Sequence, residues 1–432
     1  MRKKLLLLLF IFVIWINGCL QQESKEKVSE DFVQEDNKSI LPQEKYTPLE
    51  ESIVQSEKNI PQQSFPLGGC KNEPVTFRIS PLRLEDIQYI EPMGAMRGEH
   101  VTPTDHQYWR PPPWSEDPRP REVFAPAEGI ITNIQRLHFQ PDPNAPPTAT
   151  DYRLEIEHSC TISTVFIHIT ELSEKIEEEL GEIPATGYYS AGAIRIPVNE
   201  GEVIGTIYGT GGFHDIYQID FNVVNKEIKL NFVNPSSYEG DPWKIHIDEP
   251  FKYFNKELRQ QLLAKNLRSV EPLGGKIDYD VDGRLVGNWF KEGTGGYSAN
   301  DLAGRYWIGH LTFAYNDIDP EHIMVSMGDF EEGKTGQFGV KGNKPDPADV
   351  SVATGIIKYE LVRFDYYLGN SNQRWDRRSF ANNIKERNTD NNVEGVMLVQ
   401  MIKTRKIKFE TFPGKTASQV SDFTENAKIY ER

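Results

Sequence analysis

Three aspartates occupy alternate positions in the segment Asp278-Tyr279-Asp280-Val281-Asp282-Gly283. Carboxylates at the first, third and fifth positions, followed by a turn glycine, are typical of the start of a calcium-binding loop. The twelfth position, where such loops carry a glutamate, is Trp289. The apolar residues between the aspartates also fit an amphipathic strand that enters a hairpin turn at Asp282-Gly283. The pattern therefore predicts either a calcium ligand set or, more simply, a strand with an acidic face.

The N-terminal residues have the pattern of an export signal. Arg2-Lys3-Lys4 is followed by an apolar run at 5–16, which is shorter than the ~20 residues that a membrane-spanning helix needs. The run ends in Ile16-Asn17-Gly18-Cys19, which is similar to the lipobox of bacterial and archaeal lipoproteins. This resemblance implies cleavage after residue 18 and a lipid on Cys19, whose two acyl chains suffice for stable anchoring. The alternative is a plain secretory signal in which Cys19 has no special role.

The chain is strongly acidic, with a formal net charge of −16. Removal of residues 1–18 would take away three positive charges and leave −19. Such a surface repels phosphates and forgoes the counterion release that drives nucleic-acid binding. We therefore expect no nucleic-acid partner.

Two cysteines, Cys70 and Cys160, follow Cys19 in the sequence. Outside the cytoplasm, pairs of thiols oxidise to disulfides that persist. Export therefore predicts a disulfide between Cys70 and Cys160, and the alternative is a pair of buried free thiols.

Between residues 92 and 225, histidine, aspartate and glycine motifs follow one another in a defined order. They are His100-Val101-Thr102-Pro103-Thr104-Asp105, Val123-Phe124-Ala125-Pro126-Ala127-Glu128-Gly129, Leu154-Glu155-Ile156-Glu157-His158 with Thr164-Val165-Phe166-Ile167-His168, Val198-Asn199-Glu200-Gly201-Glu202, and Gly209-Thr210-Gly211-Gly212. This order resembles the lysostaphin-like zinc metallopeptidases, which cut peptide bonds in cell-wall peptidoglycan. The resemblance covers about a third of the chain and implies a β-sandwich of the duplicated hybrid motif fold.

The resemblance also implies a site for one divalent metal ion, with zinc expected. By position, His100, Asp105 and Asp220 would be its ligands, and His168 and Gln218 would hold the two catalytic positions. The family has a His-x-His pair where this chain has Gln218-Ile219-Asp220. A ligand set with two aspartates is harder and more anionic than the family's set, so it would accept manganese or calcium more readily. Gln218 could donate a hydrogen bond to an oxyanion but could not carry a proton.

The spacing of the first motif leaves other ligands open. The interval from His100 to Asp105 is one residue longer than in the family, and if the extra residue forms a bulge, His106 rather than Asp105 would face the metal. His214 lies in the turn before Gln218 and could reach the site from there. The structural alternatives are a turn at the first motif and a hydrogen-bonded core position for His168. Loss of the His-x-His pair predicts reduced or lost peptidase activity.

The segments that must position these residues are predicted as β-strands. Alternating or β-branched runs bounded by Gly, Pro or Asn predict strands at 75–79, 129–136, 152–158, 164–169, 202–208, 217–224, 276–280, 284–289, 305–315, 322–327, 356–367, 396–401 and 406–412. Apolar residues at helical spacing predict helices at 171–180 and 255–267. The sequence therefore predicts an all-β, mainly antiparallel fold, with a lysostaphin-like β-sandwich and a C-terminal barrel or sandwich.

The predicted order along the chain is a signal peptide at 1–18, a lipidated and disordered tether at 19–66, the metallopeptidase-like β domain at 67–235, a linker with a helix at 236–270, and a barrel-like domain at 271–432. The tether is rich in Glu, Gln, Lys and Ser, so it cannot bury enough apolar surface to fold. We expect a protein anchored to the outer face of the cell membrane that acts on a cell-wall or envelope polymer or binds it without cutting. The alternative is a lipoprotein that binds a solute or glycan and has no enzymatic activity.

Overall fold

The computed structural model describes residues 70, 72–113, 115–137, 151–181, 189–208, 217–298 and 305–432. These residues belong to one compact unit, Leu49–Arg432. The predicted signal peptide, Cys19, the tether up to residue 66, and His214 lie outside the described residues.

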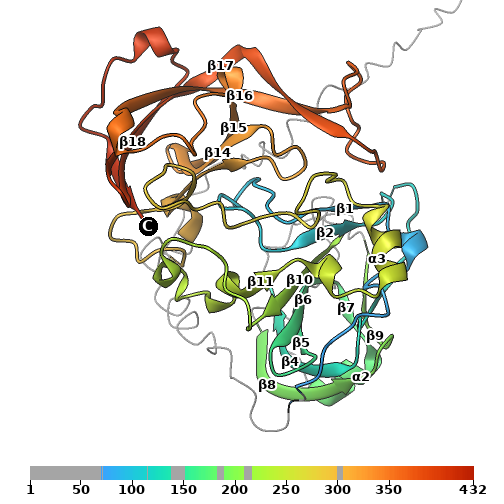
Figure 1. Cartoon of the computed structure of the whole chain (residues 1–432). Coiled ribbons are helices and arrows are strands. Elements are labelled where there is room, and N and C mark those ends of the chain that lie inside the picture. The colour runs from blue at the N-terminus through green and yellow to red at the C-terminus, as the bar shows by residue number, and fades with distance from the viewer. Residues whose placement is uncertain are drawn as a thin grey trace, which may run out of the picture. The chain divides into compact units, whose positions relative to one another are not determined.

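The first half of the described chain forms two antiparallel sheets (Figure 1). The larger sheet contains β1 (Tyr89–Glu91), β2 (Gln107–Arg110), β4 (Gly129–Arg136), β5 (Tyr152–Glu157), β6 (Ile162–Ile169), β8 (Tyr189–Val198), β10 (Ile219–Asn225) and β11 (Ile247–Asp248). Its strand order is β1-β2-β10-β6-β5-β4-β8, and β11 pairs with β10. The smaller sheet has the order β3-β9-β7 and contains β3 (Arg121–Phe124), β7 (Glu171–Leu172) and β9 (Val203–Ile207). Buried side chains of both sheets, among them Ile131, Phe166 and Ile204, join one core.

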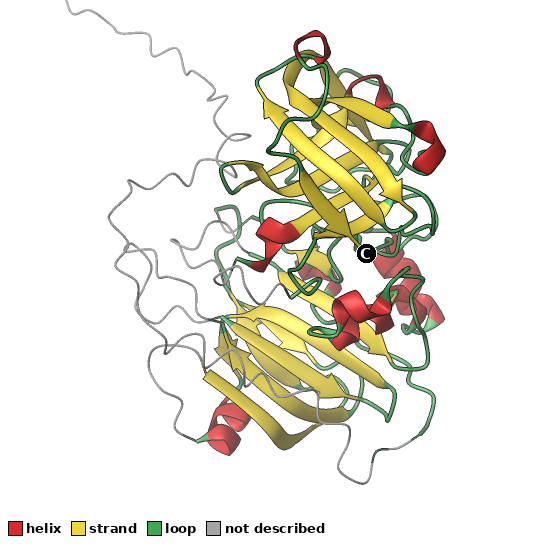
Figure 2. Cartoon of the chain, turned by 90° about the vertical axis from the view of Figure 1, so that its left-hand side faces the viewer, coloured by secondary structure: helices red, strands yellow, loops and turns green. Residues whose placement is uncertain are grey.

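The second half forms a closed antiparallel barrel. Its strands are β12 (Gly287–Lys291), β13 (His310–Tyr315), β14 (Ile323–Glu331), β15 (Lys334–Val340), β16 (Ile356–Leu368), β17 (Ile384–Lys403), β18 (Lys406–Pro413) and β19 (Lys428–Glu431). Alternate residues of these strands, such as Met397, Val399 and Met401, pack into one core inside the barrel. Figure 2 shows strands dominating both halves of the described chain. The predicted all-β, mainly antiparallel class is confirmed, and the second half is a barrel.

Two α-helices occur in the described residues, α2 (Glu174–Leu180) and α3 (Lys256–Leu263). Both lie within the predicted helices but are shorter, and residues 171–172 of the first form β7 instead. The helix α3 begins after Asn255, whose side chain accepts a hydrogen bond from the backbone of Leu258 (3.0 Å) and so caps the first turn. In the described part of the chain, neither helix has the length and hydropathy needed to cross a bilayer. Single 3₁₀ turns lie at Leu84–Asp86, Pro235–Tyr238, Pro242–His246, Pro250–Lys252, Tyr306–Gly309, Lys341–Asn343, Val352–Thr354 and Ala417–Gln419.

Asp278 and Asp280 turn inward instead of forming a strand face, whereas Asp282 is exposed. Asp278 accepts a hydrogen bond from the backbone of Asn231 (3.0 Å), and Asp280 accepts one from Val233 (3.0 Å) and one from Asn288 (2.9 Å). Residues 276–280 form no strand, so the predicted strand there is wrong. The carboxylates instead hold the segment against neighbouring backbone amides, because each amide needs an acceptor when it is buried.

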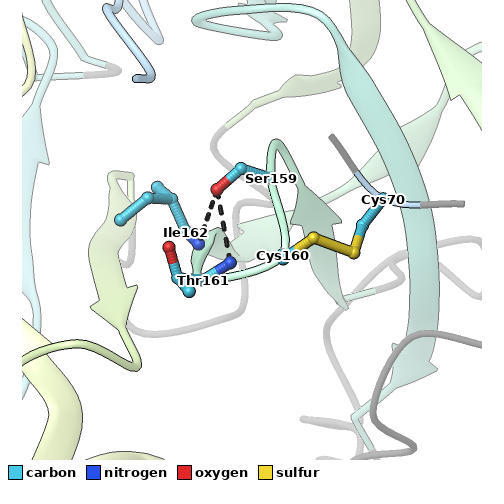
Figure 3. Close-up of a disulfide and its surroundings, with 5 residues drawn as sticks. All are labelled: Cys70, Ser159, Cys160, Thr161 and Ile162. Atoms are coloured by element: carbon cyan, nitrogen blue, oxygen red, sulfur yellow. Dashed lines mark hydrogen bonds between the residues drawn. A yellow bond between two sulfur atoms is a disulfide. The ribbon is translucent and has the colours of Figure 1, made fainter. Parts of the chain in front are cut away.

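The sulfur atoms of Cys70 and Cys160 form a disulfide that spans 90 residues of sequence. Cys160 lies in the turn between β5 and β6 (Figure 3), where the Ser159 hydroxyl accepts hydrogen bonds from the backbones of Thr161 and Ile162 (3.3 and 3.1 Å). The disulfide thus ties the start of the described chain to a turn of the larger sheet.

Candidate functional site

The site lies where β2, β10 and β6 run side by side in the larger sheet (Figure 1). Antiparallel pairing aligns Asp220 of β10 with Tyr108 of β2 on one side and with Ile167 of β6 on the other. His106, just before β2, and His168, near the end of β6, therefore meet at the start of β10. The register of three neighbouring strands brings together residues that are more than one hundred positions apart in the sequence.

Asp220 lies at the centre of this group. Its Oδ2 atom is 3.2 Å from His106 Nε2 and 3.2 Å from His168 Nε2. Gln218 Nε2 donates a hydrogen bond to the other carboxylate oxygen (2.7 Å). Gln218 and Asp220 are two positions apart, so extended backbone at the start of β10 places both side chains on the same face. Both side chains are buried.

Each histidine also contacts a second carboxylate. His106 Nδ1 lies 2.9 Å from Asp105 Oδ1, and His168 Nδ1 lies 2.8 Å from Asp151 Oδ2. The other oxygen of Asp105 accepts a hydrogen bond from the ammonium group of Lys244 (2.6 Å). Six side chains thus form one alternating series of bases and acids, in the order Lys244, Asp105, His106, Asp220, His168 and Asp151, which we call the His–Asp chain. Lys244 and Asp151 have no counterpart in the sequence prediction.

A bulge in β6 aims His168 at Asp220. Tyr152 pairs with Ile169 and Leu154 pairs with Phe166, so β6 has one residue more than β5 over this interval. His168 takes up the extra length with a φ of 71°, a value that residues other than glycine adopt rarely. A histidine held in this conformation in a strand has a cost that the surrounding contacts must offset, which is typical of functional sites.

His100 lies at the edge of the His–Asp chain. Its ring is 5.6 Å from the ring of His106, at an interplanar angle of 74°. The residue is exposed, and backbone hydrogen bonds between Arg97 and His100 close a tight turn there. On another side, the ring of Tyr108 packs 4.9 Å from that of His106. His106 therefore lies between His100 and Tyr108, and it separates the predicted ligands Asp105 and Asp220 by contacting both.

The charges of the His–Asp chain support one another. Burial alone would raise the pKa of Asp220, but His106 and His168 overcome this effect and hold the pKa below its ordinary value. Burial would lower the pKa of His168, but Asp220 and Asp151 raise that pKa well above the usual range. In the same way, Lys244 holds the pKa of Asp105 well below the ordinary value of a carboxyl despite burial. At neutral pH, His168 is therefore an imidazolium between two carboxylates.

The stability of the protein should depend on pH through Asp220 and His168. The lowered pKa of Asp220 gives stability that is present above the unfolded-state pKa of ~3.9 and is lost as the pH falls through the folded-state value. The raised pKa of His168 gives stability that is present below ~6.5 and is lost as the pH rises through the folded-state value. We expect the free energy of unfolding, measured with urea from pH 3 to 9, to be largest between about pH 4 and 6.5.

The control for this profile is the His168→Gln variant. Without the imidazolium, the decline above about pH 6.5 should become shallower, while the acid decline that comes from Asp105 should persist. Parallel profiles for the wild type and the variant above that pH would contradict the assignment.

The arrangement can be compared with the zinc site that the resemblance implies. A catalytic zinc ion needs three protein ligands that converge on one point, with a further position open to water. Within the described ranges, no group of three or more His, Cys, Asp or Glu side chains is placed so that it could hold a metal ion. The ammonium group of Lys244 lies 2.6 Å from Asp105, where a cation would have to bind, and both nitrogen atoms of His168 face carboxylates. These residues do not fit the implied zinc site.

Lys244 connects the site to the start of the barrel. Its Nζ lies 4.4 Å from the centre of the Tyr297 ring, a cation–π contact. The carbonyl of Tyr297 lies 2.7 Å from His310 Nε2, at the first residue of β13. Lys244 is therefore held from two sides, by the Asp105 carboxylate and by an aromatic ring.

Comparison with known proteins yields no sequence match and a distant match in structure. No protein-family model matches this chain, and no curated protein matches it either. Among solved structures, a chain in the structure of the SpoIIQ–SpoIIIAH pore-forming complex is similar, with 12% sequence identity, over 43% of this chain and 94% of that chain, at a TM-score of 0.24. This likeness is too distant to place the chain in a family.

Proposed function

We propose that the chain is an exported, lipid-anchored surface protein whose metallopeptidase-like domain binds a cell-wall or envelope polymer without cutting it. The observation that supports this most directly is the position of Asp220, which contacts both His106 and His168 at 3.2 Å. Side chains that would otherwise hold a metal pair with one another here: Asp220 lies against His106 and His168, and Asp105 lies against Lys244. In our proposal the domain therefore works without a metal ion that activates water.

Peptide hydrolysis at such a site needs a group that accepts a proton from the attacking water. His168 already carries its proton, because Asp151 and Asp220 raise its pKa. Gln218 donates its amide hydrogen to Asp220 and has no basic atom. His106 Nε2 faces the Asp220 carboxylate at 3.2 Å, and both side chains are buried. In our proposal the His–Asp chain therefore stabilises the domain and takes no part in catalysis.

The proposed location rests on the N-terminal pattern. A diacylglycerol thioether on Cys19 would bury two acyl chains, each CH₂ contributing about 0.8 kcal/mol to membrane binding. The acidic tether that follows would hold the folded unit away from the membrane, within reach of a polymer outside the cell. The strong negative charge of the chain fits a neutral or cationic segment of such a polymer better than an anionic one.

Metal content tests the proposal. The purified unit comprising residues 49–432 should contain much less than one equivalent of zinc, and a chelator should leave its urea unfolding midpoint unchanged. As a matched control, the variant Gln218→His/Asp220→His restores the family's His-x-His pair and should bind zinc more tightly than the wild type. One equivalent of zinc in the wild type, lost together with stability when a chelator is added, would overturn the proposal.

Polymer binding is tested by co-sedimentation. The wild-type unit should pellet with insoluble peptidoglycan and release no peptide fragments from it. The His100→Ala variant, which changes an exposed residue next to His106, should pellet less. Release of fragments by the wild type would show that the domain is an enzyme.

A further inference from the structure

The barrel carries a polar cavity of about 380 Å³ that is separate from the His–Asp chain. It is formed by the segment before β14, the turn after β15, and the ends of β16 and β17. Among the residues that line it are Asp319, His322, Asn370, Lys385, Glu386 and Asn388. No large apolar side chain takes part, so the cavity is suited to a ligand with many polar atoms.

Several buried polar atoms of these residues have no hydrogen-bond partner in the described part of the chain. They are Nδ1 of His322, both carboxyl oxygens of Glu386, and Oδ1 of Asn388. Glu386 is only 1% exposed. Buried polar atoms without partners are costly, and in native proteins each calls for an explanation such as a ligand or bound water. Here four of them belong to residues around one cavity.

A second cavity on the barrel provides a comparison. It has a similar volume of about 340 Å³ and is lined by residues of β18 and by Thr424, Asn426 and Lys428. None of its lining residues is among those in the described chain that have buried side-chain atoms without partners. Of these two cavities, the unpaired buried atoms therefore gather at the first.

The first cavity offers both donors and acceptors with little net charge. Burial, together with Asp317 and Asp319, raises the pKa of Glu386 well above its ordinary value, so this carboxyl is a neutral acid that can donate and accept. Asp319 is neutralised by Lys385 at 2.9 Å. The gap of 3.8 Å between His322 Nδ1 and Glu386 Oε1 is too long for a direct hydrogen bond. A hydroxyl group between them could bond to both.

We propose that this cavity binds a neutral, polyhydroxylated ligand, namely a single saccharide unit. Hydroxyl groups both donate and accept, which matches the neutral carboxyl of Glu386, the amide of Asn388 and the imidazole of His322. The exposed amide of Asn370 lies at the rim, where it can reach a sugar hydroxyl. This goes beyond the function proposed above, because the cavity lies on the barrel and does not depend on the His–Asp chain.

The test is titration of the full chain with monosaccharides, in a detergent that has no sugar head group. Glucose, galactose, mannose and N-acetylglucosamine are added separately, and binding is measured by saturation-transfer difference NMR and calorimetry. We expect saturable binding of at least one of the four. The variant Asn370→Ala should weaken that binding about threefold to tenfold, the effect of losing one neutral hydrogen bond. The control variant Asn426→Ala, at the second cavity, should leave it unchanged.

A buried variant strengthens the test. Glu386→Gln keeps the size of the side chain but removes the carboxyl, so it should also weaken sugar binding while the urea unfolding midpoint stays close to that of the wild type. The proposal is overturned if none of the four sugars binds saturably, or if Asn370→Ala and Asn426→Ala have equal effects. Neither result bears on the metal-content and co-sedimentation tests, which concern the other half of the chain.

Discussion

Replacing Asp220 with alanine is expected to lower the free energy of unfolding by about 3–5 kcal/mol, the range for breaking a buried ion pair by removing one partner. Asp220 is 4% exposed and contacts His106, His168 and Gln218. Without it, the imidazolium of His168 would remain buried with Asp151 as its remaining carboxylate, and the Gln218 amide would lose its acceptor. Both losses destabilise the folded state.

Urea unfolding at pH 6 measures this loss, since both Asp220 and His168 are charged there. The matched control is Asp282→Ala, which removes a carboxylate that pairs with Arg405 at the surface. Exposed pairs contribute little, so this variant should change stability far less than Asp220→Ala does. A similar small effect for both variants would mean that the His–Asp chain does not stabilise the fold.

The double variant Cys70→Ser/Cys160→Ser is expected to be less stable by about 4.5 kcal/mol. The disulfide closes a loop with a sequence separation of 90 residues, and the chain-entropy model gives a stabilisation of this size for loops of about one hundred residues. The reason is that the crosslink removes conformations from the unfolded chain. Urea unfolding of the oxidised wild type and of the double variant measures the difference.

Two controls separate the crosslink from its surroundings. The wild type unfolded in the presence of a reductant should match the double variant. Ser159→Ala, which removes the acceptor for two amides of the same turn, should cost only about 1 kcal/mol. If the reduced wild type is as stable as the oxidised protein, then the loop-closure argument does not hold for this disulfide.

The strands of the larger sheet were the easiest part to predict. The segment at 129–136 coincides with β4, and that at 152–158 differs from β5 by one residue. These strands have alternating or β-branched residues because one face meets the core, so their pattern is local. The segment at 276–280 has the same alternation, but its aspartates accept hydrogen bonds from Asn231 and Val233. Those partners lie 47 residues away, and no local pattern encodes them.

The site was predictable only in part, for the same reason. The resemblance grouped His168, Gln218 and Asp220, and these side chains lie together. The longer first motif offered His106 as an alternative metal ligand, and His106 instead contacts Asp220. Lys244 is 139 residues from its partner Asp105 and lies in a segment predicted as a linker. Asp151 precedes β5, and its contact with His168 follows from the pairing of Tyr152 with Ile169, which a sequence alone does not reveal.

The two outer strands of the larger sheet bear on how copies of this protein would behave at high concentration. The barrel is closed and offers no unpaired strand, whereas the described sheet ends in β1 and β8. Unpaired strand margins can recruit a strand from another molecule and start aggregation. The outer side of β1 is already paired, because Ile90 donates a hydrogen bond to the Lys265 carbonyl (2.8 Å) and accepts one from the Leu267 amide (3.0 Å). β8 carries the exposed Arg195 and Pro197, and the proline has no amide hydrogen to donate. Both margins are therefore poor templates, and neighbouring copies should stay separate even when crowded.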